Sequence, residues 1–97
     1  MKKILLVCAA GMSTSLLVNK MKEEAIKQGL DVHIQAVAKE KLCENIEGSD
    51  IVLLGPQIGY LEDDLKEEYS HLNIPIKVIN SIDYGMMNGK KILKESL

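Results

Sequence analysis

The chain has no Trp or Phe among its 97 residues and only three Tyr, so its core must be aliphatic and methionine-rich. Its two cysteines, Cys8 and Cys43, are too few for a disulfide scaffold, and we interpret both as reduced thiols. Basic residues are not in excess, because the formal net charge is −2 and nucleic-acid-binding domains are usually basic. Disulfide-stabilised secreted domains and nucleic-acid-binding domains are therefore disfavoured.

Long apolar runs are also missing. No segment approaches the roughly 20 apolar residues of a membrane helix. Lys2 and Lys3 followed by Ile4–Val7 and Cys8 have the order of a lipoprotein signal, but this apolar run is shorter than the roughly 7–15 residues of a signal sequence. We therefore expect a single cytoplasmic domain over residues 1–97 that does not itself span the membrane.

Four short apolar segments have the patterns of β-strands. Ile4–Val7 and Ile51–Leu54 are continuous apolar runs, typical of strands buried on both faces. Val32–Ala36, which alternates apolar and polar residues, and Ile76–Ile79 are expected at the sheet edges. Because helical segments alternate with these strands, we predict an α/β fold with an open four-stranded parallel sheet, order 2-1-3-4, and helices on both faces.

Apolar residues at helical spacing predict the intervening helices. These are expected over residues 13–28, 39–46 and 61–69. Gly29 and Gly48 fit the ends of the first two helices. A last helix is predicted from a Ser81 cap, with four residues on its inner face: Ile82, Met86, Leu93 and Leu97.

In a sheet of this order, ligands bind at the carboxyl ends of the strands, where the winding reverses between strands one and three. Two loops therefore carry the functional expectation, Cys8–Ser15 and Gly55–Tyr60. The first contains small residues, a glycine and three hydroxyls, and such a strand–loop–helix turn forms an anion site from backbone N–H groups. Its predicted phosphate-binding residues are Ala9, Ala10, Gly11, Met12, Ser13, Thr14 and Ser15.

A thiolate beside a phosphate-sized anion site is a nucleophile directed at phosphorus, which makes Cys8 the candidate catalytic residue. The alternative is that Cys8 is simply a buried residue at the end of a strand, as free cysteines often are. The loop is neither a Walker loop nor a dinucleotide fingerprint, since it lacks their glycine and lysine patterns.

These residues resemble the IIB component of the bacterial sugar phosphotransferase system (PTS), in its lactose/cellobiose (chitobiose) family. The resemblance covers nearly the whole chain. Its matching pieces are Lys3–Ser15, Gly55–Ile58, Ile76–Ile79 and Tyr84–Gly89. Gly59 departs from the pattern, because many members carry a basic or larger residue there.

The resemblance implies a phosphocysteine at Cys8, in a domain that needs no cofactor. A phosphohistidine on a IIA protein would donate the phosphoryl group to Cys8. The group would then pass to a sugar held by the membrane permease IIC, and the family suggests a β-linked disaccharide such as cellobiose or chitobiose. Met12 and the rim of the loop would meet IIA and IIC in turn.

The loop also resembles that of low-molecular-weight tyrosine phosphatases, which would make the protein a hydrolase. Those enzymes have arginine where this chain has Thr14, and that guanidinium holds the transferring phosphoryl group. Asp83 is the one tempting general acid, although we expect it in the first turn of the last helix. Without these groups a phosphocysteine should persist, as a carrier requires.

Two further classes stay open. A thiol-dependent arsenate reductase would need a resolving cysteine near Cys8, and Cys43 is the only other cysteine. A module that binds an anion without transferring it would use the same loop with an inert thiol. Gln57 and Tyr84 are possible accessory residues near the reactive edge. His33 and His71 are isolated from other metal ligands, so we predict no metal.

Overall fold

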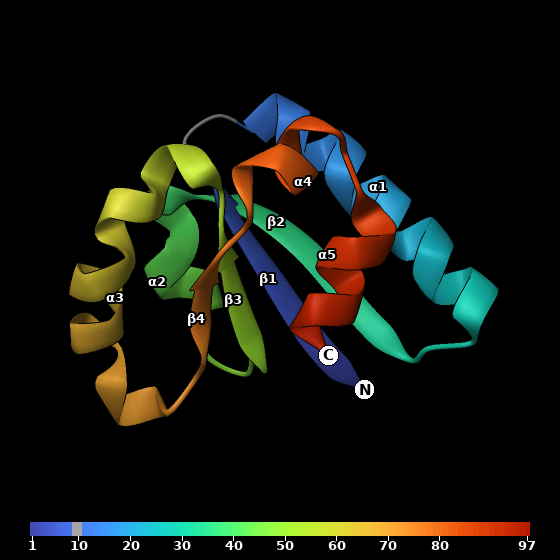
Figure 1. Ribbon diagram of the computed structural model, residues 1–97. Coiled ribbons are helices and arrows are strands. Elements are labelled where there is room, and N and C mark those ends of the chain that lie inside the picture. The colour runs from blue at the N-terminus through green and yellow to red at the C-terminus, as the bar shows by residue number, and fades with distance from the viewer. Residues whose placement is uncertain (9–10) are drawn as a thin grey trace.

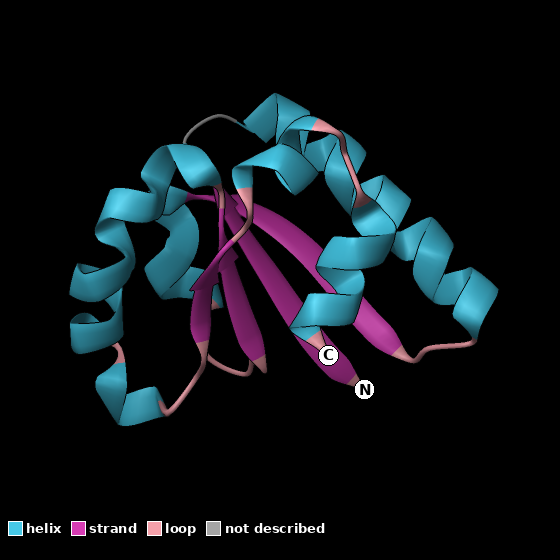
Figure 2. Ribbon diagram, in the orientation of Figure 1, coloured by secondary structure: helices cyan, strands magenta, loops and turns pink. Residues whose placement is uncertain are grey.

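The computed structural model describes residues 1–8 and 11–97, with side chains at 1–8 and 15–97. Its sheet has four parallel strands in the order β2-β1-β3-β4, which confirms the predicted fold class and strand order (Figures 1 and 2). The strands are β1 (Lys2–Cys8), β2 (Val32–Ala38), β3 (Ile51–Leu54) and β4 (Ile76–Val78).

Helices cover both faces of this sheet. One face carries α1 (Gly11–Gln28), α4 (Ser81–Gly85) and α5 (Gly89–Ser96), and the other carries α2 (Leu42–Asn45) and α3 (Glu62–Glu68) (Figure 1). Short 3-10 turns precede α2 and α3 and follow α3, at Lys39–Lys41, Pro56–Leu61 and Ser70–Leu72.

The continuous apolar run of β1 contributes to two cores. Ile4 and Leu6 belong to the core under α1 and α5, whereas Leu5 and Val7 belong to the core under α2 and α3. All four are at most 2% exposed. Each such side chain removed from water contributes roughly 1.5–3 kcal/mol, so packing on both faces holds β1 firmly in the sheet.

The predicted last helix is wrong, because the chain forms two helices there. Asn80 rather than Ser81 caps α4, its side-chain oxygen accepting from the N–H groups of Ile82 (2.9 Å) and Asp83 (3.2 Å). Met87 then adopts the left-handed conformation at φ 54°, and Asn88 caps α5. Because of this break, the side chains before and after it do not continue along one helix face.

The break also explains why most of the predicted inner face is exposed. Leu93 is 1% exposed, whereas Ile82 is 68%, Met86 71% and Leu97 53% exposed. A four-residue spacing read across two helices of different direction does not define one face.

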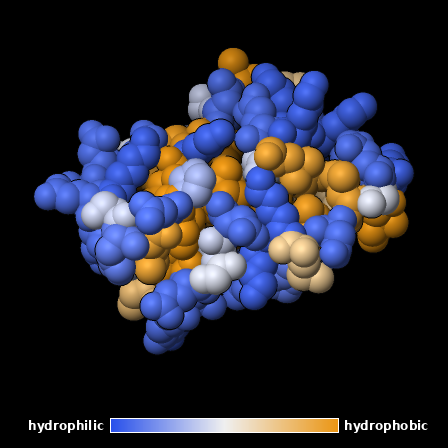
Figure 3. All heavy atoms as spheres, turned by 90° about the horizontal axis from the view of Figure 1, so that it is seen from below, coloured by the Kyte–Doolittle hydropathy of each residue, from blue (hydrophilic) through white to orange (hydrophobic). Residues whose placement is uncertain are grey.

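The chain ends lie together at the amino end of the strands. The Lys2 Nζ donates a hydrogen bond to the Leu97 carbonyl oxygen at 3.0 Å. Figure 3 views the molecule from this end and shows hydrophilic residues over most of it, with hydrophobic residues gathered in patches between them. Cys8 ends β1 at the opposite, carboxyl edge of the sheet.

Helices α1 and α5 approach closely at Gly89. A Cβ at this position would lie 2.9 Å from the backbone carbonyl carbon of Lys20 and 2.9 Å from the backbone nitrogen of Met21. Backbone atoms yield less readily than flexible side chains, so α1 or α5 would have to shift to accommodate any other residue.

We expect Gly89→Ala to lower the free energy of unfolding by about 1–3 kcal/mol, since this overpacking exceeds the gain of up to about 1 kcal/mol in helix propensity. Urea unfolding followed by circular dichroism measures this change in the free energy of unfolding. Gly85→Ala is the matched control, because a Cβ at Gly85 has no neighbour within 4 Å. Equal stability of the two variants would show that the helices adjust without strain.

Candidate functional site

Cys8 is the last residue of β1, where that strand pairs with Ala38 at the end of β2. Helix α1 begins at Gly11, closer to Cys8 than the predicted start at Ser13. The first four N–H groups of an α-helix have no partner within the helix, and they form its positive end. Cys8 therefore lies beside the electropositive start of an 18-residue helix.

The second predicted loop lies against Cys8. Gly55 follows β3, and its N–H donates to the Val7 carbonyl oxygen at 2.8 Å. A Cβ at Gly55 would lie 3.5 Å from the Cys8 Cβ and 3.1 Å from the Gln57 side-chain oxygen. Gly55 is therefore the point at which the two loops meet. Gln57 is exposed, which leaves its amide accessible beside Cys8.

Gly59, the departure from the family pattern, packs on the edge strand. A Cβ there would lie 3.3 Å from the Val78 Cγ1, so a larger residue would require Val78 to move. The 3-10 turn Pro56–Leu61 thus fits closely over β4 in this chain.

The predicted phosphate-binding residues are only partly within the described structure. Ala9 and Ala10 lie outside the described residues, as do the side chains of Met12, Ser13 and Thr14. The backbone of residues 11–14 forms the first turn of α1, and the exposed Ser15 follows in the same helix. Ser13, Thr14 and Ser15 thus lie near the start of α1, as expected, although the helix begins two residues before Ser13.

The accessory candidate Tyr84 lies on α4 and is 7% exposed. It packs in the core beneath α1 and α5, with Ile79 and Leu93 among the members of that cluster. Gln57 and Tyr84 therefore differ in kind, because one is an exposed polar group beside Cys8 and the other a buried aromatic side chain.

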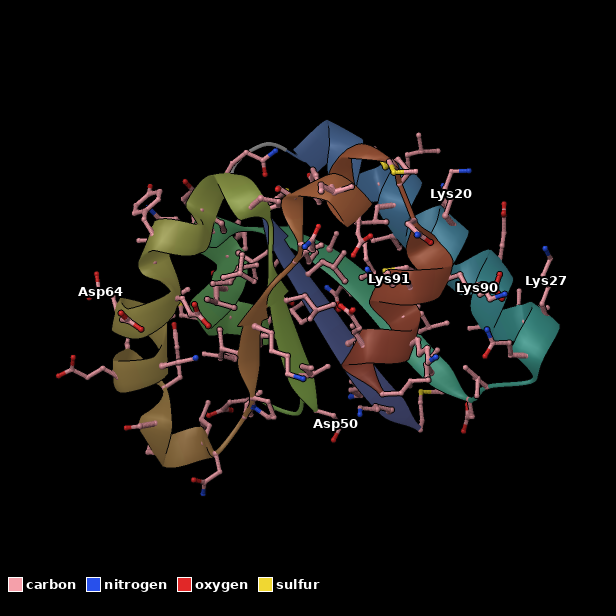
Figure 4. All side chains as sticks on the ribbon, in the orientation of Figure 1. Lys20, Lys27, Asp50, Asp64, Lys90 and Lys91 are labelled. Atoms are coloured by element: carbon pink, nitrogen blue, oxygen red, sulfur yellow. The ribbon has the colours of Figure 1, made fainter. Side chains whose placement is uncertain are left out.

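Asp83 lies in the first turn of a helix, as expected, although that helix is α4 rather than the last one. Its side chain is 7% exposed, and Oδ2 is 3.3 Å from the Lys91 Nζ on α5. That oxygen forms no hydrogen bond within the described residues, so the ammonium group compensates it by charge. Figure 4 shows Lys91 and Lys90 leaving α5 in different directions, with Lys90 toward α1. The only candidate general acid is thus held between two helices.

Cys43 lies on α2, on the other face of the sheet from α1. The pKa of Tyr69, at the end of α3, is raised by burial, by its hydrogen bond and charge interaction with Glu68, and by Cys43. Cys43 is therefore near the end of α3 and is exposed, whereas Cys8 is buried at the end of β1. This arrangement gives no support to Cys43 as a resolving cysteine.

The described residues contain no group of three or more His, Cys, Asp or Glu side chains arranged to hold a metal ion. None of the helices in the described part of the chain combines the length and apolarity needed to cross a membrane.

A protein-family model described as the PTS system, lactose/cellobiose-specific IIB subunit, matches residues 3–95. The chain belongs to this family. It is therefore a IIB phosphoryl carrier and a phosphotransferase component, a class that implies IIA and IIC partners.

Relatives within the IIB family differ in the sugar that their names specify. The PTS oligo-β-mannoside-specific EIIB component of Bacillus subtilis (strain 168) is 47% identical, over 100% of this chain and 94% of its own length. Two components from Lactococcus lactis, galactose-specific in strain MG1363 and cellobiose-specific in strain IL1403, are each 40% identical over 95% of this chain and 90% of their own length.

Solved structures agree with the IIB fold. The cellobiose-specific IIB component of Borrelia burgdorferi aligns with a TM-score of 0.81 and 43% identity, over 98% of this chain and 87% of that one. A lactose-specific IIB domain of Streptococcus pneumoniae aligns with a TM-score of 0.87 and 22% identity, over 97% and 92%. A YwlE mutant from Bacillus subtilis aligns with a TM-score of 0.57 and 16% identity, over 99% of this chain and 91% of that one. This last match confirms the predicted likeness to the low-molecular-weight phosphatase fold.

The burial of the two cysteines predicts a clear order of reaction with an alkylating agent. Cys8 is 2% exposed, whereas Cys43 is exposed. We expect iodoacetamide to modify Cys43 at least about tenfold faster than Cys8 in the native protein, because a buried thiol reacts only after local opening. Peptide mapping by mass spectrometry over time measures both rates. In denaturant the two rates should converge, and faster native labelling of Cys8 would contradict its burial.

Proposed function

We propose that this IIB protein accepts a phosphoryl group on the Cys8 sulfur from a IIA phosphohistidine and passes it to a sugar bound by IIC. The observation that carries the proposal is the position of Cys8 at the end of β1, directly before the amino end of α1. In parallel sheets of this order, the carboxyl edge at this strand is where ligands bind. Membership of the IIB family supplies the donor and the acceptor.

In the first step, the edge opens locally around the buried Cys8, and its thiolate attacks phosphorus in line with the P–N bond of the phosphohistidine. The S–P bond forms, the P–N bond breaks, and the histidine leaves with its electron pair and takes a proton from solvent. Backbone N–H groups of residues 9–15 hold the equatorial oxygens, assisted by the hydroxyls of Ser13 and Thr14. The positive end of α1 stabilises the added charge.

In the second step, a sugar hydroxyl attacks the phosphocysteine. The O–P bond forms, the S–P bond breaks, and Cys8 leaves as thiolate while the hydroxyl proton passes to a base at the acceptor site or to solvent. Little bond chemistry is required of the carrier beyond positioning and charge stabilisation. The exposed Gln57 amide, beside Gly55, is available to hydrogen-bond the phosphoryl group or the incoming histidine.

A carrier must protect its phosphocysteine from water, and two features support this. Thr14 stands where the phosphatases have arginine, so the strong hold on a hydrolytic transition state is missing. Asp83 is buried and its Oδ2 is 3.3 Å from the Lys91 Nζ, so this carboxyl group is held in an ion pair rather than exposed to a leaving group. We therefore favour transfer over hydrolysis.

Exposed hydrophobic side chains surround the carboxyl edge and suit transient docking of IIA and IIC. Leu16 on α1, Tyr60 after β3, and Ile82 and Met86 after β4 are each more than half exposed. They come from the elements that follow three different strands. A small apolar rim of this kind fits successive partners, which must each bind and leave. Because donor and acceptor meet the carrier on the cytoplasmic side, we assign the protein to the cytoplasm.

For the sugar we propose a β-linked disaccharide such as cellobiose or chitobiose. The support is that two relatives are named for oligo-β-mannosides and for cellobiose. The alternative sugar is galactose, because the galactose-specific relative has the same 40% identity as the cellobiose-specific one. Transport assays with the cognate IIC distinguish galactose from a β-linked disaccharide.

Incubation with phosphoenolpyruvate, the general PTS proteins and a IIA donor should add one phosphoryl group to the chain, detected by intact mass. Cys8→Ser should abolish the adduct or replace it with one of different stability, because the attacking thiolate is lost. Cys43→Ser is the matched control and should keep the adduct. An adduct that persists unchanged in Cys8→Ser, or steady release of inorganic phosphate from an aryl phosphate, would sink the carrier assignment.

Replacing both Ser13 with Ala and Thr14 with Val should slow phosphoryl transfer to Cys8 by about 10- to 100-fold, since two hydroxyl donors to a developing charge are removed. Rapid-quench measurement of phosphocysteine formation gives the rate. The melting temperature, followed by circular dichroism, should stay close to that of the unmodified protein. Unchanged transfer would show that backbone groups alone hold the phosphoryl oxygens.

A further inference from the structure

Two adjoining cavities form a continuous groove between α1 and the edge strand β2. Their volumes are about 380 and 200 Å³, and Lys22, His33 and Ile34 line both. The groove runs from Ser15, near the start of α1, to Leu30 beyond its end. It therefore follows the whole seam between the helix and the strand, which Figure 1 shows side by side.

The groove has an apolar floor and a polar rim. Val18, Ala25 and Ile34 in its floor are buried, whereas Lys22 and His33 on its rim are exposed. Apolar pockets bordered by a few polar groups are typical of ligand and peptide sites.

The strand beside this groove is an unprotected sheet edge. Strand β2 pairs only with β1 in the described part of the chain, and its sequence Val32–Ala38 contains no Pro and no Lys. Natural proteins usually guard an exposed edge with such residues, because its unpaired backbone groups attract another strand. An edge strand flanked by a helix groove is the arrangement used when an extended peptide adds to a sheet.

The charge of the rim selects the kind of peptide. Lys22 lies in the middle of the groove, and no Asp or Glu is among the residues that line either cavity. A second copy paired through β2 would bring Lys22 and His33 toward a surface carrying the same groups, which disfavours self-association. An acidic segment would instead be attracted to Lys22.

We propose that the seam between α1 and β2 binds an extended acidic segment of a partner protein, which adds as a fifth strand beside β2. Backbone hydrogen bonds to β2 supply the affinity. Acidic side chains at every second position of the segment face the groove and meet Lys22, and the apolar side chains between them face the other side of the sheet, because side chains alternate along a strand. Apart from Ser15 at one end, this surface runs along the seam away from Cys8, so a segment bound between Lys22 and Leu30 would tether a partner without occupying the reactive edge.

A direct test uses a capped, fluorescein-labelled peptide of about eight residues in which Val and Glu alternate, a length that matches a typical strand. Fluorescence anisotropy with the full chain should show saturable binding. A second peptide with Lys in place of each Glu should bind at least about fivefold more weakly, as expected from the charge of Lys22. Amide chemical shifts in NMR spectra should move mainly in β2 and α1.

The matched variants are Lys22→Glu and Lys27→Glu, both on α1 and both at exposed positions. Lys27 lies outside the groove, near the end of α1 and on its outer side in Figure 4. Lys22→Glu should weaken binding of the acidic peptide at least about fivefold and favour the basic one, whereas Lys27→Glu should stay within about twofold of the unmodified protein.

Three results would overturn the proposal: no saturable binding of the acidic peptide, equal losses in the two variants, or shifts that cluster away from β2. If β2 amides instead become protected as protein concentration rises without peptide, a second copy fills the groove and the proposal is also wrong. None of these measurements uses a phosphoryl donor, so their failure leaves the carrier assignment unaffected.

Discussion

The site depends on the immobility of β1, which is held along both of its edges and on both of its faces. Strand β2 pairs with it from Lys2 to Cys8 and β3 from Ile4 to Val7, and its alternating side chains contribute to two separate cores. The hydrogen bond from the Gly55 N–H to the Val7 carbonyl oxygen fixes the backbone of the residue just before Cys8. A nucleophile placed on such a strand end starts from a defined position, so that positioning does not have to be achieved during the reaction.

Much of this framework is readable from the sequence because it rests on strong local patterns. The continuous runs Ile4–Val7 and Ile51–Leu54 predicted the two central strands, since only a strand covered on both faces tolerates apolar residues at every position. The alternation in Val32–Ala36 predicted an edge strand. The proximity of Gln57 to Cys8 followed from the rule that strand ends meet at one edge of a sheet, although the role of Gly55 as the meeting point did not appear in any local pattern.

The carboxyl-terminal segment escaped prediction for a physical reason. Met87 takes a left-handed conformation that methionine rarely adopts, and Asn80 and Asn88 both act as caps. Gly89, at the start of α5, also approaches the α1 backbone closely, a tertiary contact that no local pattern in the sequence indicates. The burial of Asp83 and its pairing with Lys91 depend on the break between α4 and α5, so they were equally invisible to a search for periodicity.

The closeness of the chain ends has a consequence for how a carrier of this shape is used in an assembly. Lys2 and Leu97 are joined by a hydrogen bond at the amino end of the sheet, while Cys8 faces the carboxyl end. Any polypeptide joined to either end would therefore depart from the side opposite the reactive cysteine. A domain fused to either terminus of the carrier would thus leave the same face free to exchange the phosphoryl group.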